Sequence, residues 1–525
     1  MMSQGNQAEA EQRQDEVLAF LARPSSYEPA PDTVKRIDTH AAIIFLAGDF
    51  AYKVKRAVTL PYLDFSTLEM REAVCRREVE INRRTAPDIY IGVVAITRGR
   101  EGALAIGGKG QPVEWAVKMR RFDQSKLLDR LAEQDDLPIE AMSSLADKIA
   151  GLHAQARANR RFDHDGAMSR VVIEPVSKAA GKAPPLIAKR EAVGFVRAFQ
   201  EELGRNRTLL ERRARQGYVR RCHGDLHLRN IVMIGDAPVL FDAIEFDEDI
   251  ATIDILYDLA FLLMDLWHLD LRAHANAVFN AYIRYPEAGG PLAALEGLRL
   301  LPLYLAARAG VRAMVALDRL AVVKGQERDK ARQEFIEFFG LASGFLETRG
   351  PRLFAVGGVS GTGKTTLARN LAPFVGDAPG ALVVRSDVER KRLAGAGETE
   401  KLSPRHYTKR ATGLVYRSCF AKAEAALAAG HSVILDAVFA RRDQRQRARQ
   451  IADREGVPFA GIWLEAPERK LVERVEGRSG DASDADAGVV RRQLDYDLGD
   501  IDWLRVDSGG NAGAVCRNVR RRLGL

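Results

Sequence analysis

The feature that most constrains this chain is a glycine-rich turn at residues 358–365, which reads Gly-Val-Ser-Gly-Thr-Gly-Lys-Thr. A fully apolar run at 353–356 precedes the turn, and a segment of helix-forming type starts at Thr366. Strand, glycine turn and helix in this order form a complete P-loop, in which backbone N–H groups surround phosphates. The sequence therefore predicts an α/β nucleotide-binding domain in the last third of the chain.

The P-loop pattern also names the residues expected to contact the nucleotide phosphates. They are Gly358, Ser360, Gly361, Thr362, Gly363, Lys364, Thr365 and Thr366. In this pattern the lysine supplies positive charge, and the hydroxyl of Thr365 reaches Mg2+. ATP and Mg2+ are thus the expected cofactors.

Three more buried strands, at 381–384, 432–435 and 461–464, alternate with helical segments. Such alternation predicts a doubly wound parallel sheet with its site at the carboxyl ends of the strands. Asp387 and Asp436 follow two of these strands, so both should lie beside the P-loop. Either could orient an acceptor hydroxyl, hold Mg2+ or cap a helix; we assign Asp387 to catalysis and Asp436 to the metal.

Two arginines, Arg474 and Arg478, are spaced i, i+4 on a predicted helix at 471–478. A polar stretch at 479–488, rich in Gly, Asp and Ser, follows them. This arrangement is typical of a mobile lid that closes over the transferred phosphate, and both arginines are candidate catalytic residues. The alternative is an exposed arginine face balanced by neighbouring glutamates.

A second motif, His-Gly-Asp-Leu-His-Leu-Arg-Asn, occupies residues 223–230, and Val-Leu-Phe-Asp follows at 239–242. Its spacing of Asp225, Asn230 and Asp242 is that of a kinase catalytic loop followed by a metal-binding aspartate. Asp225 would orient the substrate hydroxyl. Asn230 and Asp242 offer oxygen ligands of the kind that hold Mg2+ against ATP.

Two β-rich runs, at 41–46 and 50–54, flank an Ala-Gly-Asp turn at 47–49 and predict a hairpin. Lys53 and Lys55 lie on one face of its second strand, because side chains two apart point the same way. Either lysine is a candidate to bind the α- and β-phosphates of ATP.

A capping box at 66–69, Ser-Thr-Leu-Glu, predicts a helix that runs to about Arg84. Val74, Glu78 and Ile81 fall at i, i+4 and i+7, so Glu78 should face inward. A buried carboxylate needs a cationic partner, and a lysine of the hairpin is the obvious one.

The first two thirds of the chain resemble the aminoglycoside phosphotransferase family, with its choline-kinase and fructosamine-kinase relatives. The resemblance is carried by Lys53, Glu78, the run His223-Gly224-Asp225, Asn230 and Asp242. It implies a small β-rich lobe and a larger helical lobe with ATP between them. It favours Lys53 over Lys55 as the ATP-binding lysine, and it implies that Asp258 anchors the catalytic loop.

The last third resembles small P-loop kinases such as gluconate kinase and chloramphenicol phosphotransferase, and more distantly zeta toxin. The expected fold class is an α+β protein-kinase-like two-lobed domain followed by an α/β doubly wound P-loop NTPase domain. The expected divisions are 1–30 (tail and lead-in helix), 31–122 (β-rich lobe), 123–340 (helical lobe), 341–351 (linker) and 352–525 (P-loop kinase-like domain).

Composition limits the possible partners and compartments. The apolar region 253–271 is interrupted by four aspartates, which indicates a buried helix rather than a membrane span. The four cysteines are far apart with no CxxC pair, which argues against a zinc site or a disulfide framework and favours the cytoplasm. The net charge of +8 falls entirely in residues 351–525, as suits a domain that binds phosphates.

Together these features predict a bifunctional ATP-dependent phosphotransferase whose domains each act on a hydroxyl of a small molecule. One alternative is a nucleotide-binding regulatory switch with slow ATPase activity. Another is a polynucleotide 5′-kinase, for which the arginines at 441–454 would bind phosphates. That segment has no aromatic platform for bases, which argues against a nucleic-acid partner. No membrane partner is expected, and the oligomeric state is left open.

Overall fold

The computed structural model describes residues 14–39, 41–60, 63–160, 186–285, 291–477 and 482–525. Their contacts divide the chain into two compact units. The first contains the described residues of Met1–Arg160 and Val219–Asp258, and the second those of Arg161–Tyr218 and Leu259–Leu525. Each unit has its own sheet and its own hydrophobic core.

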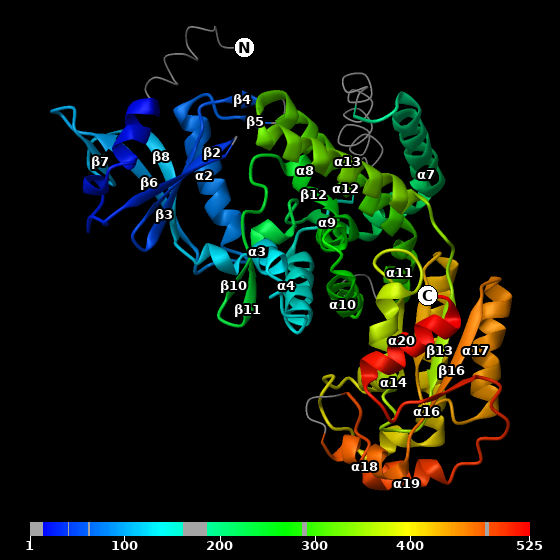
Figure 1. Ribbon diagram of the computed structural model, residues 1–525. Helices are drawn as coiled ribbons and strands as arrows, with labels where there is room; N and C mark the ends of the chain where they lie inside the picture. Colours follow the sequence, from blue (N-terminus) through cyan, green and yellow to red (C-terminus); the bar gives the residue numbers. More distant parts are fainter. Residues whose placement is uncertain (1–13, 40, 61–62, 161–185, 286–290, 478–481) are drawn as a thin grey trace. The chain divides into compact units, whose positions relative to one another are not determined.

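An antiparallel sheet with the strand order β1-β2-β3-β8-β6-β7 begins the first unit (Figure 1). Its strands are β1 (Val34–Asp38), β2 (Ala42–Ala47), β3 (Phe50–Lys55), β6 (Tyr90–Arg98), β7 (Leu104–Ile106) and β8 (Gln111–Arg120). The predicted hairpin is confirmed, because β2 and β3 pair directly, with Ala47 opposite Phe50. Gly48 has φ +56° in the two-residue turn, a conformation that glycine adopts without strain.

Helix α2 (Leu68–Asn82) packs on strands β8 and β6 of this sheet. Its N-cap is Thr67, whose hydroxyl accepts a hydrogen bond from the Met70 N–H at 3.2 Å. The predicted capping box begins one residue earlier, at Ser66, and is wrong in register. The N–H of Ser66 instead donates to the Asp64 carboxylate at 3.0 Å, which keeps Ser66 in the preceding turn.

Short helices and strands complete the first unit. They are α3 (Leu128–Glu133), α4 (Ala141–Gln155), β9 (Val219–Arg221), β10 (Ile231–Ile234), β11 (Ala237–Leu240), α8 (Glu248–Ala251) and β12 (Thr252–Asp254). Strand β9 pairs with β12, and β10 pairs with β11, both antiparallel. The predicted catalytic loop therefore runs between two small ribbons that hold both of its ends.

Helices form the first part of the second unit: α7 (Lys189–Gln216), α10 (Arg272–Tyr282), α11 (Pro291–Glu296), α12 (Leu301–Val322) and α13 (Gln326–Leu346). Helix α9 (Ile255–His268) begins in the first unit and belongs to the second from Leu259 onward. As predicted for the apolar region around it, α9 is buried along most of its length. Among the described helices, one segment, Gly297–Ala321, is long and apolar enough to span a membrane, and 67% of its most apolar window is buried inside the protein.

The division between the two compact units does not fall at the predicted linker, residues 341–351. Helix α13 continues to Leu346, and α10 and α11 contact the part of the chain that carries the P-loop. Helices α7 and α10 to α13 of the predicted helical lobe therefore belong to the same compact unit as the P-loop sheet, whereas α3, α4 and α8 belong to the first unit. The predicted domain boundaries themselves stay a prediction.

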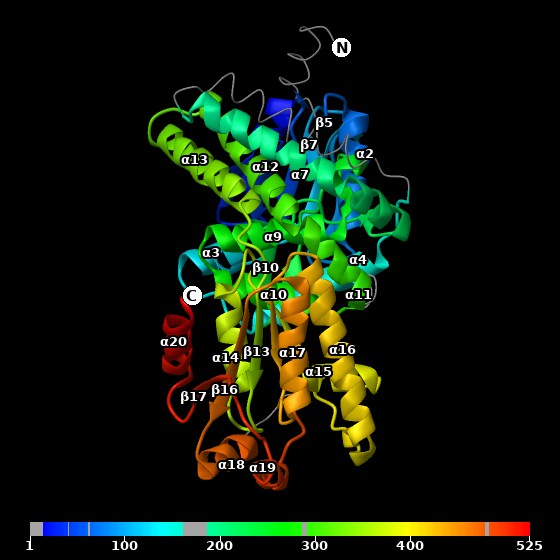
Figure 2. The ribbon, with the colours of Figure 1, turned by 90° about the vertical axis from the view of Figure 1, so that its right-hand side faces the viewer.

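The P-loop sheet is parallel, with the strand order β14-β15-β13-β16-β17. Its elements are β13 (Leu353–Gly357), α14 (Lys364–Leu371), β14 (Leu382–Arg385), α15 (Ser386–Leu393), α16 (Lys409–Ala428), β15 (Val433–Asp436), α17 (Arg442–Glu455), β16 (Phe459–Glu465), α18 (Glu468–Glu476), α19 (Ala487–Leu494), β17 (Leu504–Asp507) and α20 (Ala512–Leu523). Helices α14 and α20 cover one face, and α16 and α17 the other (Figure 2). The predicted doubly wound sheet is confirmed.

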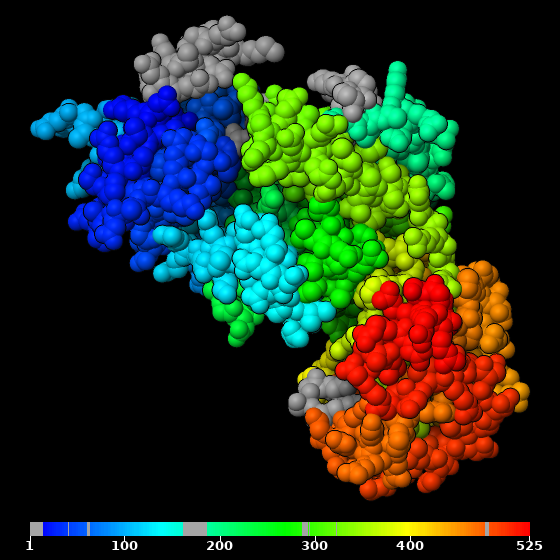
Figure 3. Space-filling model, viewed as in Figure 1, coloured from blue at the N-terminus to red at the C-terminus, as the bar shows by residue number. Residues whose placement is uncertain are grey.

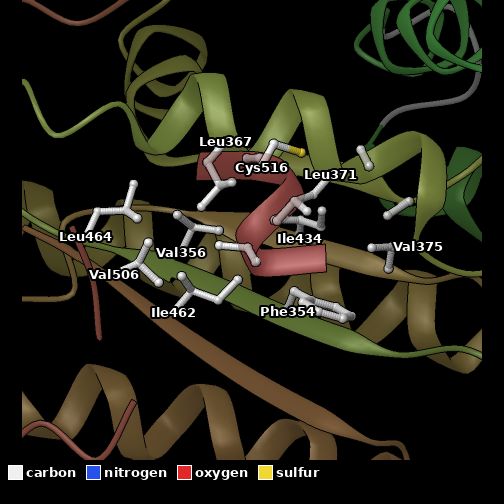
Figure 4. Packing of buried hydrophobic residues seen from close by; sticks show 14 residues of the cluster. Phe354, Val356, Leu367, Leu371, Val375, Ile434, Ile462, Leu464, Val506 and Cys516 are labelled. Carbon is white, nitrogen blue, oxygen red and sulfur yellow. The ribbon is translucent and has the colours of Figure 1, made fainter. Parts of the chain in front are cut away.

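The core on the α14 side of this sheet is apolar and tightly enclosed (Figure 4). Phe354 and Val356 of β13 meet Leu367 and Leu371 of α14, and all four are at most 3% exposed. Burying such side chains contributes roughly 1.5–3 kcal/mol each. The continuously buried strand β13 and the helical spacing of apolar residues along α14 thus hold the glycine turn between them in place.

The last helix, α20, closes the same core with Cys516 and Val519, which are buried. Its opposite side carries Arg517 and Arg521, both exposed to solvent. In Figure 3 this helix is the red segment on the visible surface of the P-loop part. Cys516 therefore serves packing, in keeping with its place in the apolar cluster.

We expect the buried His431 to make the second unit sensitive to acid. Its ring lies 5.0 Å from that of Phe279, and burial lowers the pKa of His431 from 6.5 to about 4. The unfolded chain then binds more protons between these values, so stability is complete above pH 6.5 and is lost toward pH 4. The loss should reach about 3 kcal/mol.

The measurement is the unfolding free energy of wild type and of His431→Phe between pH 4 and pH 7. Phenylalanine cannot titrate and keeps a ring against Phe279. The unfolding free energy of wild type should therefore fall relative to that of His431→Phe as the pH is lowered. A difference that is constant with pH would contradict this assignment.

Candidate active sites

The loop after β9 carries Asp225 and Asn230, the predicted catalytic residue and metal ligand. The Nδ2 of Asn230 donates to Asp225 Oδ2 at 2.9 Å and to the Asp225 carbonyl at 3.0 Å. His227, which has no role in the predicted site, also lies here, with Nε2 3.3 Å from Asp225 Oδ2. The Asp225 side chain is 40% exposed, so it can face a substrate while its neighbours orient it.

A buried carboxylate holds the start of this loop. Asp258 accepts the N–H of Gly224 at 2.8 Å through Oδ1 and the N–H of His223 at 3.1 Å through Oδ2. Its Oδ2 also lies 3.0 Å from His153 Nε2. Gly224 has φ +85°, a turn that most side chains would strain. The anchoring role that the resemblance implied for Asp258 is confirmed by these contacts.

Lys53 joins two of the predicted nucleotide-site residues. Its Nζ lies 2.9 Å from Glu78 Oε1 and 2.5 Å from Asp242 Oδ1. Burial alone would raise the pKa of Glu78, but the ammonium groups of Lys53 and Lys55 outweigh burial and lower it to about 2. Glu78 is therefore charged, fully buried and able to fix the position of the lysine.

The structure also places Lys55 at the same carboxylate, which the sequence left as an alternative. Its Nζ lies 2.6 Å from Glu78 Oε2 and forms a second ion pair with Glu245. Lys53 alone reaches Asp242, which agrees with the preference for Lys53. Glu245 was missed; the signal was an acidic residue three positions after Asp242, available to neutralise a second buried lysine.

Asn230 and Asp242 are neighbours because β10 and β11 form a hairpin. The N–H of Phe241 donates to the Asn230 carbonyl at 3.0 Å, and Asp242 follows directly. Asp242 has φ +60°, a left-handed conformation that is held by a hydrogen bond from its N–H to the Tyr90 hydroxyl at 3.2 Å. One amide oxygen and one carboxylate are a donor set that fits Mg2+.

A buried group of potential metal ligands, His153, Cys222 and Asp258, lies behind the loop, with the ligand atoms within 4.8 Å of one another. Both oxygens of Asp258 already accept backbone N–H bonds. The Sγ of Cys222 donates to the Ile253 carbonyl at 3.5 Å. We interpret this group as the structural anchor of the catalytic loop.

Glu78→Gln should destabilise the first unit, because Glu78 neutralises two buried lysines. Lys53 keeps Asp242 and Lys55 keeps Glu245, so we expect a loss of about 2 kcal/mol, below the full cost of breaking a buried pair. Urea denaturation would measure it. Glu80→Gln on the same helix, where the carboxylate is 69% exposed, is the control and should cost under about 0.5 kcal/mol. Equal losses in both variants would contradict the assigned role of Glu78.

The P-loop has the backbone that the glycine pattern predicts. Gly358, Gly361 and Gly363 have φ of +139°, +85° and +84°. A Cβ on Gly358 would lie 2.7 Å from the Leu464 carbonyl, and one on Gly361 2.6 Å from the Leu471 carbonyl. Glycine is therefore required both by the positive φ and by the lack of space for a Cβ. The resulting loop has the open backbone that a phosphate needs.

Thr365 and Asp436 form the expected pair beside the loop. The hydroxyl of Thr365 donates to Asp436 Oδ2 at 2.6 Å, and a hydroxyl with a carboxylate is a donor set that fits Mg2+. Lys364 Nζ donates to the Val359 carbonyl at 3.0 Å, across the turn that would hold the phosphates. The structure therefore brings the predicted nucleotide-binding and metal-binding residues together.

The other residues predicted to contact phosphates differ in their hydrogen bonds and in their exposure. Thr362 is buried, and its hydroxyl donates to the Val359 carbonyl at 2.8 Å, so it holds the shape of the loop. The N–H of Ser360 donates to Gln493 Oε1 at 2.7 Å. Thr366 is exposed in the first turn of α14.

Asp387 lies in the first turn of α15, near Lys364 and Asp436. Burial raises the pKa of Asp387, an effect that Asp436 strengthens and Lys364 opposes. A carboxylate with a raised pKa beside a phosphate site is suited to accept a proton from an acceptor hydroxyl. The helix N-cap is Arg385, so Asp387 does not cap this helix.

Arg474 of α18 contacts the P-loop directly. Its guanidinium donates to the Gly361 carbonyl at 3.3 Å and to the Ser508 carbonyl at 2.8 Å. The predicted partner Arg478 lies outside the described residues, as does the start of the predicted lid, 479–481. The lid function of both arginines stays a prediction.

One basic residue of this site was missed from the sequence. Arg385, at the end of β14, is buried, with Nε 3.5 Å from Asp436 Oδ2 and Nη2 3.5 Å from Thr365 Oγ1. The available signal was an arginine two positions before Asp387, at the sheet edge where the acidic residues converge.

Two family models match the chain: the phosphotransferase enzyme family over residues 75–296 and the AAA domain over residues 353–496. Uncharacterized proteins of Mycobacterium tuberculosis and Mycobacterium bovis are 30% identical to it over 501 residues, which is 93% of this chain and 94% of each relative. The chain belongs to the family of these mycobacterial proteins. Because the alignment spans both matched regions, the family carries the two domains in one polypeptide.

Solved structures resemble each part of this family member. A choline/ethanolamine kinase family protein from Mesorhizobium loti is 16% identical, covering 64% of this chain and 99% of its own, with a TM-score of 0.37. The GDP complex of aminoglycoside 2′-phosphotransferase-IIIa is 15% identical, covering 62% of this chain and 99% of its own, with a TM-score of 0.38. A gluconokinase from Sinorhizobium meliloti is 22% identical, covering 34% of this chain and 93% of its own, with a TM-score of 0.25.

The matched models confirm both the resemblances and the fold class: a kinase-like α+β domain followed by a P-loop kinase-like α/β domain. The match to the phosphotransferase enzyme family places this chain in the class of ATP-dependent kinases or phosphotransferases. The residues that the models span include Glu78, the catalytic loop and the entire P-loop.

Proposed function

We propose that both domains transfer the γ-phosphoryl group of ATP to a hydroxyl of a small molecule, which makes the protein bifunctional. The observation that carries this proposal is that each domain has a full set of oriented polar groups. In the first, Lys53 bridges Glu78 and Asp242. In the second, Thr365 binds Asp436 beside the P-loop lysine.

In the first site, Asp225 orients and deprotonates the acceptor hydroxyl. Asn230 holds one of its oxygens, so the other carboxylate oxygen can face the acceptor. Lys53, fixed by Glu78, binds the phosphates of ATP. Positioning and charge stabilisation of this kind are the main source of rate in phosphoryl transfer.

In the second site, the P-loop N–H groups and Lys364 bind the phosphates, and Asp387 receives the acceptor hydroxyl. Arg474, already at the Gly361 carbonyl, is close enough to the loop to neutralise charge on the transferred group. Arg478 would add a second positive charge from the lid.

Magnesium is the metal that we propose for both sites. It would be held by Asn230 and Asp242 in the first and by Thr365 and Asp436 in the second, since all four supply oxygen ligands. Bound Mg2+ neutralises the charge that develops on the phosphate oxygens.

We further propose a cytoplasmic protein whose partners are small molecules, with no nucleic-acid or membrane partner. Two arginines at and within α17 that could bind nucleic acid, the N-cap Arg441 and Arg447, form ion pairs within the protein. Arg441 pairs with Asp443 at 2.7 Å, and Arg447 with Glu424 at 2.9 Å. The main alternative, a nucleotide-binding switch, would keep ATP binding without an acceptor.

The experiment is transfer of labelled phosphate from ATP to a panel of hydroxyl metabolites, aminoglycosides and oligonucleotides. Wild type, Asp225→Asn and Lys364→Ala are run in parallel, so that each product is assigned to one domain. Products lost in one variant and kept in the other would support two transferase sites. ATP binding without transfer to any acceptor would favour the switch, and labelled oligonucleotides would favour the polynucleotide kinase.

A further inference from the structure

Helix α10 is hydrogen-bonded to the exposed edge of the P-loop sheet. Strand β14 is an edge strand, so half of its backbone groups have no strand partner. Asn276 Nδ2 donates to the Pro379 and Ala381 carbonyls, both at 3.0 Å. Asn280 accepts the Val383 N–H at 2.7 Å and donates to the Ala381 carbonyl at 3.1 Å. Two asparagines thus replace a neighbouring strand.

The same helix leads to a chain of charges that enters the P-loop site. Arg284, just beyond the end of α10, forms an ion pair with Glu398. The other oxygen of Glu398 lies 3.4 Å from Arg385 Nη1. Side-chain exposure falls along this chain, from 36% for Arg284 and 35% for Glu398 to 8% for Arg385.

Arg385 is the inner end of the chain and contacts the proposed metal-binding pair. Its Nε lies 3.5 Å from Asp436 Oδ2, and its Nη2 lies 3.5 Å from Thr365 Oγ1. The guanidinium is therefore shared between two carboxylates, Glu398 outside and Asp436 inside. Its position depends on how strongly each carboxylate attracts it, because the attraction of opposite charges grows as they approach.

We propose that Arg284 is a positioning residue for the P-loop site, acting through Glu398 and Arg385 on Asp436 and Thr365. With Arg284 present, the charge of Glu398 is divided between two arginines. Without it, Glu398 attracts Arg385 alone and draws it from the metal-binding pair. The inference rests on the proposed function of the P-loop domain, and it makes a helix that precedes that domain part of its site.

The test measures how much Mg2+ strengthens the binding of the ATP analogue AMP-PNP. Calorimetry is run on the full chain with Asp242→Ala, so that metal-dependent binding comes from the P-loop site. Arg284→Ala should reduce the strengthening by Mg2+ about fivefold, in the range found for residues that couple sites through networks. Binding in EDTA should stay the same, because the P-loop backbone and Lys364 are untouched.

Matched variants separate the relay from simple docking of the helix. Arg272→Ala is the control, since Arg272 lies on the same helix and pairs with Asp270 at 2.8 Å; it should match the parent. Arg284→Lys should keep most of the Mg2+ effect and serves if Arg284→Ala does not fold. Glu398→Gln removes the carboxylate that would draw Arg385 outward, so it should not reproduce Arg284→Ala, and the double variant should behave like Glu398→Gln alone. Equal defects in Arg284→Ala, Glu398→Gln and the double variant would instead indicate simple docking of the helix.

A charge exchange decides between the two explanations. Arg284→Glu with Glu398→Arg restores an outer ion pair but places an arginine against Arg385. The relay predicts a Mg2+ effect that differs from that of wild type, because the new arginine repels Arg385 instead of attracting it. Recovery of the wild-type Mg2+ effect would show that the pair only fastens the helix and would overturn the proposal.

The result for Lys364→Ala in the same background keeps the two proposals distinguishable. Unchanged AMP-PNP binding in Lys364→Ala would refute the proposed P-loop site itself. Weakened binding there, together with a wild-type Mg2+ effect in Arg284→Ala, would refute the positioning role alone.

Discussion

Asp225→Asn should lower the phosphotransferase rate of the first domain by roughly 10³-fold, the scale of a lost catalytic acid or base. Its affinity for ATP should change less than about twofold, a shift well below that of a lost hydrogen bond to a charged group. The reason is the position of the carboxylate. Asp225 is held by Asn230 on one side and is 40% exposed on the other, while Lys53, Glu78 and Asp242 form the nucleotide side of the site.

Asparagine preserves the shape of the side chain, and its amide oxygen can still accept from Asn230 Nδ2, so the loop should stay folded. The rate is measured with whichever acceptor the panel identifies, and ATP binding by calorimetry. Asp236→Asn, on the exposed turn between β10 and β11, is the control and should be fully active. Turnover at the wild-type rate in Asp225→Asn would remove this residue from catalysis.

Lys364→Ala should weaken ATP binding at the P-loop roughly 10- to 100-fold, which corresponds to about 1.5–3 kcal/mol for a hydrogen bond to a charged group. Its Nζ now donates to the Val359 carbonyl across the phosphate turn, a position from which it can reach bound phosphates without moving the backbone. The alanine variant loses the charge and leaves the glycine conformations intact.

Calorimetry should count two ATP molecules on the wild-type chain and one on Lys364→Ala at the same ATP concentration. Lys330→Ala, an exposed lysine of α13 that pairs with Glu327, controls for the loss of one positive charge and should still bind two. If the wild-type chain itself binds one nucleotide, the two-site proposal fails.

The sequence determined the features that depend on neighbouring residues. The P-loop, its flanking strand and its helix lie within twenty residues, so backbone conformation and hydrophobic spacing specify them together. The same is true of the hairpin before Lys53 and of the spacing from Asp225 to Asn230. The capping box failed by one residue because Asp64, a nearby but unconsidered acceptor, binds the Ser66 N–H.

The tertiary structure alone determined which residues from distant parts of the chain come into contact. Lys53 and Asp242 are separated by 189 positions, and only the tertiary structure shows that Lys53 reaches Asp242 whereas Lys55 reaches Glu245. Glu245 and Arg385 belong to their sites for the same reason. An isolated charged residue carries no periodicity that identifies its partner.

The docking of α10 on β14 is the clearest case of this difference. The sequence indicated separate domains on either side of residues 341–351, because composition changes there and a new strand begins. Asn276 and Asn280 read as ordinary polar residues of a surface helix. They are buried or half-buried because the edge strand offers unpaired carbonyl and N–H groups that must be satisfied. That requirement exists only once the sheet has formed, so no local pattern could reveal it.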